Sequence, residues 1–186
     1  MQNSASTVIA LFIAATLVFI VPLVTLTDRN DNVTQENVKL IVEEFVTEVK
    51  NTGKLTRNQY QEFEDQLVAT GNVYDIEIEI QHLDENPGKK TAQANYTKIG
   101  ENVYYSEYTT QILKQIGIKV SADDLVDESN DTIVLKEGDF IYVKVQNQNS
   151  TTAQTLKSSF LSFSNADEYV ISADSSGMIT VNGIKD

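Results

Sequence analysis

The stretch "VIALFIAATLVFIVPLVTL", residues 8–26, contains nineteen residues and no charged side chain. Thirteen of these residues are Leu, Ile, Val or Phe. A helix of this length reaches about 28 Å, which is close to the ~30 Å hydrocarbon core of a bilayer. At about 0.3–0.6 kcal/mol each, the large apolar residues favour insertion by roughly 4–8 kcal/mol. The stretch therefore predicts a transmembrane helix, and Pro22 near its end is tolerated in such helices.

A retained anchor fits this segment better than a secretion signal that is removed. Secretion signals carry a positively charged start, a shorter apolar core and small residues at the cleavage site. Residues 1–7 contain no Lys or Arg, and Val24 and Leu26 occupy the positions where small residues are needed. We therefore expect residues 1–27 to stay attached as an N-terminal transmembrane anchor, with residues 8–26 held in membrane lipid.

All 41 charged residues lie between Asp28 and Asp186, so residues 28–186 carry the whole net charge of −13. This length is ample for one domain with its own core. An acidic domain repels nucleic acid, and we expect no nucleic-acid partner. The chain contains no cysteine, which excludes disulfides, thiolate metal sites and cysteine nucleophiles.

The side of the membrane on which this domain lies is a matter of two opposing signals. Arg29 and Lys39 follow the apolar stretch and no basic residue precedes it, which by the positive-inside rule favours a cytoplasmic domain. That rule loses force for long domains, and Asp28 and Asp31 lie beside the basic residues. A short N-terminal tail before a domain rich in Asn, Thr and Ser favours export. We expect a single-pass protein of the cell membrane with residues 28–186 outside the cytoplasm.

Apolar periodicity predicts a helical hairpin after a polar break at residues 28–32. Apolar residues at helical spacing share one face of the first helix: Val38, Ile41, Val42, Phe45 and Val49. Gly53 ends that helix, and residues 51–56 form the bend. Thr56 and Gln59 form a capping-box pattern that opens the second helix, which ends at Gly71. The second helix buries Tyr60, Phe63 and Leu67.

The apolar period then changes from helical to two, which indicates strands. "YDIEIEIQ", residues 74–81, alternates isoleucine with acidic residues, and "FIYVKVQ", residues 140–146, alternates in the same way. Between them we expect a turn at 84–90 and a short helix with Tyr105, Tyr108, Ile112 and Ile116 on one face. "EYVISA" and "GMITVNGI" predict closing strands. The fold class is therefore α+β: a transmembrane helix, a helical hairpin and a small antiparallel sheet domain.

Chemistry-bearing motifs are scarce. His82 is the one histidine, and no serine, threonine or second base stands in a recognisable arrangement with it, so we interpret it as a surface or structural residue. The isolated glycines form no phosphate loop. We expect no enzyme activity, no catalytic residue and no cofactor.

Two acidic clusters invite comparison with calcium sites. Asp28, Asn30 and Asn32 have the spacing that opens a calcium loop, but Val33 stands where glycine is required. The segment "ADDLVDESND", which carries five acidic residues between 123 and 131, offers oxygen ligands suited to calcium, although an exposed acidic loop explains it equally well. We predict no metal site and leave calcium at residues 123–131 open.

An apolar N-terminal helix with an amphipathic continuation and a small sheet domain is the general plan of pilins and pseudopilins. Residues 45–79, about a fifth of the chain, resemble a segment of small anchored proteins that accompany tight-adherence (Tad) pilus loci in Gram-positive bacteria. The matching elements are "TGK" (52–54), "LT" (55–56), the helix with Tyr60 and Phe63, and "TGNVYDIEIE" (70–79), with weaker echoes in "KEGDF" (136–140) and "SGMITV" (176–181).

The departures from that family define what the resemblance implies. Type IV pilins carry a glutamate near the start of the apolar helix, whereas residues 8–26 contain none, and Ala5 is a poor leader-cleavage point. Pro22 is similar to the proline of tight-adherence pseudopilins. The resemblance therefore implies a minor or accessory pseudopilin with little leader processing, whose partners are other pilus or secretion proteins. The alternative is an anchored extracytoplasmic domain that binds or senses a ligand.

Small residues indicate where the apolar helix would meet another helix. In lipid, helices associate through close packing at small side chains. Ala10 and Ala14 are four residues apart and share one helix face, so we expect them to line any helix–helix contact. The alternative is that both alanines merely face lipid.

Overall fold

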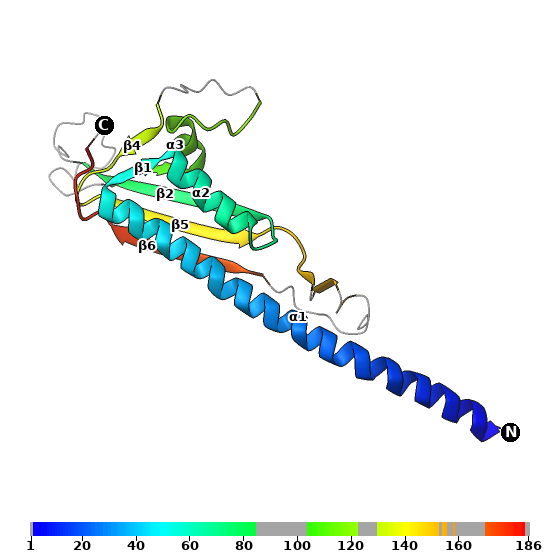
Figure 1. Cartoon of the computed structure of the whole chain (residues 1–186). Coiled ribbons are helices and arrows are strands. Elements are labelled where there is room, and N and C mark those ends of the chain that lie inside the picture. The colour runs from blue at the N-terminus through cyan, green and yellow to red at the C-terminus, as the bar shows by residue number, and fades with distance from the viewer. Residues whose placement is uncertain are drawn as a thin grey trace, which may run out of the picture.

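The computed structural model describes residues 2–84, 104–122, 130–152, 154–155, 158 and 170–184. Its fold is α+β, as the sequence predicts: a long N-terminal helix leads into a small domain built on an antiparallel sheet (Figure 1). The described elements are α1 (Gln2–Thr52), β1 (Lys54–Thr56), α2 (Arg57–Val68), β2 (Tyr74–Leu83), β3 (Tyr104–Tyr108), α3 (Thr109–Gln115), β4 (Thr132–Val134), β5 (Phe140–Asn147) and β6 (Ser172–Met178).

Helix α1 is continuous over 51 residues, and the polar break expected at residues 28–32 does not occur. This prediction was wrong for a physical reason. The segment contains neither glycine nor proline, so its backbone can continue the helical hydrogen bonds. Asp31 is also buried against the domain, where it accepts a hydrogen bond from the Thr151 hydroxyl at 2.6 Å. The boundary that we expected between residues 27 and 28 therefore lies within one helix.

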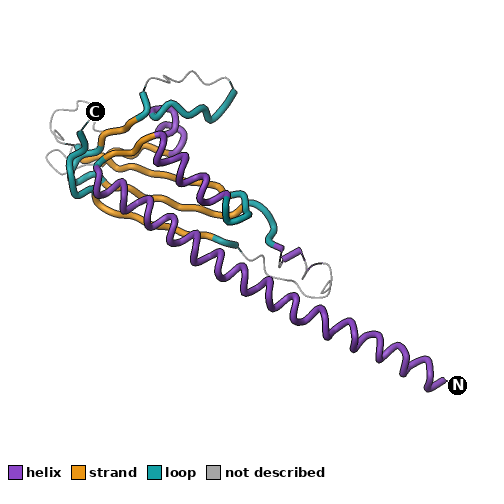
Figure 2. Tube along the Cα trace, in the orientation of Figure 1, coloured by secondary structure: helices purple, strands orange, loops and turns teal. Residues whose placement is uncertain are grey.

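The second half of α1 packs on the sheet through the face that the sequence predicts. Val38, Val42 and Val49 are fully buried and Phe45 nearly so, while Ile41 is partly buried. The ring of Phe45 stacks on Phe63 of α2 with centroids 4.2 Å apart. Figures 1 and 2 show α1 and α2 lying over the same side of the larger sheet.

Helix α2 begins as its sequence predicts. Thr56 is the N-cap, the Gln59 backbone N–H donates to its hydroxyl, and the Gln59 side chain accepts from the Thr56 backbone N–H at 2.8 Å. Tyr60, Phe63 and Leu67 are buried. This capping box supplies two of the hydrogen bonds that a helix start otherwise lacks.

The larger sheet has the strand order β3-β2-β5-β6, and all its pairs are antiparallel. The predicted alternation is confirmed in both central strands. Side chains on the inner face enter the core with α1, and these are Ile78, Ile80, Ile141, Val143 and Val145, with Ile76 partly buried. The acidic and aromatic residues between them, such as Glu79 and Tyr142, lie on the outer face.

The predicted bend between α1 and α2 holds a strand as well. Residues 54–56 form β1, which pairs antiparallel with β4. Gly53 makes the bend possible because its φ of +63° is left-handed and its Cα approaches the backbone of Val181 and Gly183. A Cβ at this position would lie 2.3 Å from the Val181 carbonyl oxygen.

Two further element predictions need correction. Tyr105 and Tyr108 belong to strand β3, and the helix begins only at Thr109, although Ile112 and Ile116 are buried as expected. The three tyrosines at 104, 105 and 108 favour a strand, and the pairing of residues 104–108 with β2 outweighs their helical spacing. The closing strands reduce to β6 within the described residues. The predicted turn at 84–90 lies outside them except for Asp84.

Candidate functional site

The first half of α1 projects from the domain into open space (Figure 1, Figure 2). It is long and apolar enough to cross a membrane, and none of its most apolar stretch is buried against the domain. Phe12, Val18 and Phe19 are more than 65% exposed. An exposed apolar surface of this size is unfavourable in water, and residues 8–26 are long enough to bury it in the hydrocarbon core of a bilayer.

Three threonine hydroxyls within this projecting half are satisfied by the helix itself. The hydroxyls of Thr16 and Thr25 donate to the carbonyls of Phe12 and Val21, one turn back, at 2.9 Å each. Thr27 donates in the same manner to Val24 at 2.9 Å. Hydrogen bonds of this kind remove the cost of placing a hydroxyl in lipid. Pro22 lies inside the helix without ending it.

Ala10 and Ala14, the residues predicted to line a helix–helix contact, are both exposed on the projecting half of α1. Their spacing of four places them on one side of the helix, about one turn apart. Neither contributes to the core of the domain. Both alanines therefore lie where a second helix can reach them.

The junction between the projecting half and the domain is held by buried polar contacts. Asp31 and Thr34 are 6% and 7% exposed, although they follow closely on the apolar stretch. The Gln35 side chain accepts from the Ser172 backbone N–H at 3.1 Å and donates to the Ser172 carbonyl, so it pairs with the start of β6 as a strand would. At the other end of α1 the Lys50 carbonyl accepts from the Thr180 hydroxyl at 3.1 Å. The helix is fixed to the sheet along its whole second half.

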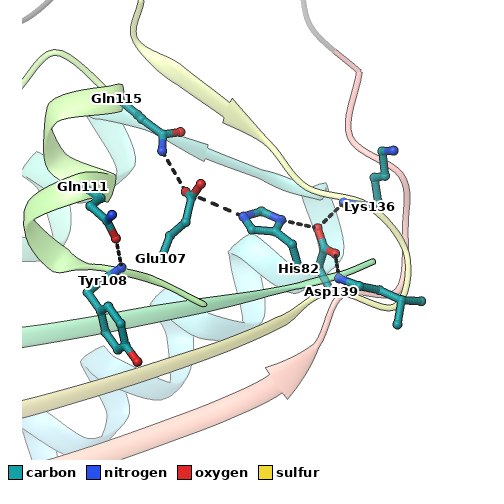
Figure 3. A network of polar contacts seen from close by, with 8 residues as sticks. His82, Glu107, Tyr108, Gln111, Gln115, Lys136 and Asp139 are labelled. Atoms are coloured by element: carbon teal, nitrogen blue, oxygen red, sulfur yellow. Dashed lines mark hydrogen bonds and ion pairs between the residues drawn. The ribbon is translucent and has the colours of Figure 1, made fainter. Parts of the chain in front are cut away.

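His82 lies at the end of β2 in a polar cluster that Figure 3 shows from close by. Its Nδ1 is 3.0 Å from Asp139 Oδ2, and its Nε2 is 3.7 Å from Glu107 Oε2. The ring stacks on Tyr105 with centroids 5.0 Å apart. The Gln115 side chain donates to Glu107 at 2.7 Å. The histidine is thus neither isolated nor on the open surface.

Asp139 is the centre of this cluster, and it serves the backbone. It is 2% exposed and accepts from the backbone N–H groups of Leu83 at 3.0 Å and Lys136 at 2.9 Å. A buried carboxylate with three donors joins the end of β2 to the turn before β5. A cavity of about 360 Å³ opens beside the cluster, and His82, Glu107 and Asp139 belong to its lining. The geometry is that of a structural clamp. Of the two alternatives that we expected for His82, a surface or a structural residue, these contacts fit the second.

The described residues offer no group of three or more His, Asp or Glu side chains that could hold a metal ion. Asp28, Asn30 and Asn32 lie on a helix and not in a loop, so they cannot wrap an ion as a calcium loop does. Of the acidic segment 123–131, residues 123–129 lie outside the described residues.

A third feature occupies the outer face of the larger sheet. Tyr108, Glu79 and Tyr142 stand in one row across three strands, with Glu79 in the middle. Hydrogen bonds from Gln81 and Ser106 hold the pKa of Glu79 below its usual value. A cavity of about 340 Å³ opens on this row, and Glu77, Thr109 and Thr110 complete its polar lining.

Sequence reasoning missed each of these polar groupings, because all of them join residues far apart in the chain. Asp31 pairs with Thr151, and His82 pairs with Asp139. A partial signal exists for Glu79, since strand alternation places it on the solvent side of an Ile-Glu strand. No local sequence pattern predicts that Tyr108 and Tyr142 lie beside it.

Comparison with protein-family models, curated proteins and solved structures found no match to this chain.

Proposed function

We propose that this chain is a non-enzymatic membrane protein that acts as a minor or accessory, pseudopilin-like component of a pilus or secretion assembly, with its domain outside the cytoplasm. One observation carries the proposal: a single unbroken helix forms both the exposed apolar segment and a buried part of the domain core. An anchor that only tethers a domain can end in a flexible linker. Here the last apolar residue, Leu26, lies only five positions before the buried Asp31.

Rigid coupling has a mechanical consequence. Force or rotation applied to the segment in the membrane reaches the domain directly, and the domain keeps one orientation to the membrane plane. Such coupling benefits a subunit that occupies a fixed place among neighbours. A diffusing receptor domain has less need of it.

The outward side of α1 supports the same proposal. Leu26 and Leu40 lie seven positions before and after Val33. Seven residues is the period at which packed helices repeat their contacts. Val33 and Leu40 lie on the side of α1 opposite to the buried valines, at 53% and 61% exposed. They extend an exposed apolar stripe of α1 beyond residues 8–26. The residues of this stripe are Phe12, Phe19, Leu26, Val33 and Leu40.

Two further parts of the proposal rest on the sequence. A domain rich in Asn, Thr and Ser favours export. The resemblance of residues 45–79 to proteins of tight-adherence pilus loci suggests the kind of assembly. Ala10 and Ala14 are the residues that we assign to helix packing within the membrane.

The test is in vivo photo-cross-linking from positions 10 and 14, with position 20 as the control, which lies about 80–120° around the helix from both alanines and from the stripe of Phe12 and Phe19. We expect positions 10 and 14 to capture a partner helix and position 20 to capture much less. Ala10→Leu with Ala14→Leu should preserve membrane insertion, because the segment only becomes more apolar, and should weaken incorporation into the assembly. Absence of any captured helix, with pili that assemble normally without the protein, contradicts the proposal.

A second candidate function is supported by the cavity on the outer face of the sheet. An anchored ligand-binding or sensory domain would use such a cavity, whereas a purely structural subunit has no need of it. The two functions are separable, because the cavity lies on the face of the sheet turned away from α1.

A further inference from the structure

We propose that the row Tyr108–Glu79–Tyr142 on the outer face of the sheet is a binding site for an alkylammonium group in solution. This site goes beyond the assembly role, because it uses the face of the sheet that α1 does not contact.

The carboxylate of Glu79 is held in place before any ligand arrives. Its Oε1 accepts from the Ser106 hydroxyl at 2.7 Å and from the Gln81 amide at 3.0 Å. Both donors stabilise the ionised form. Among the described residues Oε2 of Glu79 accepts no hydrogen bond, so one carboxylate oxygen is available to a cationic ligand.

Two tyrosines stand on either side of this carboxylate. In the strand register Glu79 is directly opposite Tyr108 of β3 and directly opposite Tyr142 of β5. Adjacent strands are about 4.8 Å apart, so the two tyrosine backbones are roughly 10 Å apart. Tyr108 is 59% exposed and points to the side of β3 opposite to Glu107 (Figure 3). An ammonium group between the two rings meets the conditions for cation–π attraction, which acts within about 6 Å of a ring centroid.

The cavity at this row favours an organic cation over other ligands. Its volume of about 340 Å³ accommodates a small organic group, and its lining combines the aromatic rings with Glu77, Glu79 and the side of α3. The carboxylates repel anions. A bare metal ion would not use the faces of the rings, and it would find Glu77 already paired with Lys144 at 3.3 Å.

The position of the row decides where the ammonium group comes from. Leu26 and Gln35 are nine residues apart on α1, a rise of roughly 14 Å. Gln35 contacts Ser172, and the β6 residue in line with Tyr142 is Ser176, roughly 13 Å further along the strand. The row thus stands roughly 25 Å beyond the end of the apolar segment, out of reach of the ~5–8 Å headgroup layer of the anchoring bilayer. The ligand is therefore a soluble ammonium compound, and not a headgroup of that bilayer.

The experiment titrates choline into the full-length protein in phosphatidylglycerol nanodiscs and follows amide signals by NMR. The control ligand is 3,3-dimethyl-1-butanol, which has the shape of choline without its charge. We expect choline to shift the signals of residues 79, 108 and 142, and the neutral compound to leave them unchanged. Equal shifts from both compounds, or none from choline, overturn the proposal. Nanodiscs of phosphatidylcholine should give the same choline affinity; a lower apparent affinity there means that lipid headgroups occupy the site and contradicts a soluble ligand.

Three variants with the same change of charge locate the site. Glu79→Gln should weaken choline binding at least tenfold. Glu77→Gln should weaken it no more than threefold, because that carboxylate is paired with Lys144. Glu62→Gln on the exposed side of α2 should have no effect. Tyr142→Leu gives an independent test and should also weaken binding, and signals away from the row report that each variant is folded. Unchanged affinity in both Glu79→Gln and Tyr142→Leu contradicts the assignment.

Discussion

At the scale of single residues, buried polar side chains connect elements that are distant in the sequence. Asp31 fixes α1 to the segment at Thr151, and Asp139 fixes the end of β2 to the turn before β5. Each is buried and each accepts from at least one donor far away in the sequence. Carboxylates in such positions stabilise the fold because their removal leaves donors without acceptors.

Asp139 and His82 should differ in their contribution to stability. Asp139→Ala removes the acceptor of two backbone N–H groups and of His82, so we expect the free energy of unfolding to fall by about 3 kcal/mol. His82→Gln retains a side-chain donor for Asp139 and leaves both backbone contacts, so we expect a loss of about 1 kcal/mol or less and no change of cellular phenotype. Urea unfolding of the full-length protein in detergent micelles, followed by near-ultraviolet circular dichroism, measures both.

Glu62→Ala is the control, because this exposed residue of α2 should change the free energy of unfolding by less than about 0.5 kcal/mol. Equal losses for Asp139→Ala and Glu62→Ala would show that the clamp is not structural. A His82→Gln protein that is fully stable but inactive in cells would reveal a function of the histidine that the clamp does not explain.

At the same scale, the charge state of Glu79 has a predictable pH dependence. Hydrogen bonds from Gln81 and Ser106 lower its pKa in the folded state. The stabilisation from this residue is therefore present above the pKa of the unfolded state and is lost as the pH falls through the folded pKa. Ser106→Ala removes one donor and should raise the pKa of Glu79 toward its usual value, as measured by carbon-detected NMR of the glutamate carboxyl groups. A pKa that does not move would mean that Ser106 does not stabilise the ionised form.

At the scale of elements, the predictions succeed where the pattern is local. The capping box at Thr56 and Gln59, the buried stripe from Val38 to Val49 and the two alternating strands are all confirmed. The predictions fail where contacts with another element determine the secondary structure. Residues 104–108 form a strand because β2 lies beside them, and residues 28–32 stay helical while Asp31 pairs with Thr151. The site on the outer sheet face belongs to this second kind, because it exists only through strand register.

The continuity of α1 should be essential to the proposed assembly role and dispensable for folding. Replacing Arg29 and Asn30 by Gly-Gly weakens the helix by roughly 2 kcal/mol relative to Ala-Ala and introduces a hinge. The Ala-Ala variant removes the same side chains and keeps the helix, so it is the matched control. We expect both proteins to fold and to insert into membranes, and only the Gly-Gly protein to incorporate poorly into the assembly. Equal incorporation of the two variants would show that rigid coupling is unnecessary.

At the scale of the whole molecule, the charge distribution divides the chain into an uncharged apolar segment and a strongly acidic domain. The projecting half of α1 is uncharged up to Thr27, and the domain carries the entire net charge of −13. A domain of this charge stays soluble at the high local concentration of a membrane surface. In the proposed orientation α1 acts as a stem of fixed length, which sets the height of the domain above the bilayer.

The proposed orientation makes a direct prediction for intact cells. Protease added to protoplasts should digest residues 28–186, because we place the domain outside the cytoplasm, and should leave the segment in the membrane. The control is a cytoplasmic protein of the same cells, which must survive the treatment. Protection of the domain until the membrane is permeabilised would place it in the cytoplasm, as the positions of Arg29 and Lys39 favour.

The central claim is that α1 passes unbroken from the membrane into the domain. The chain has no cysteine, so spin labels can be attached at two introduced positions, Ala15→Cys in the apolar segment and Thr47→Cys above it. Both positions are exposed, and 32 residues of continuous helix separate them by about 48 Å. Pulsed electron–electron double resonance in nanodiscs should give one narrow distance distribution centred near 48 Å. A broad distribution, or one centred well below that distance, would mean that the helix breaks at the membrane surface and would contradict the account.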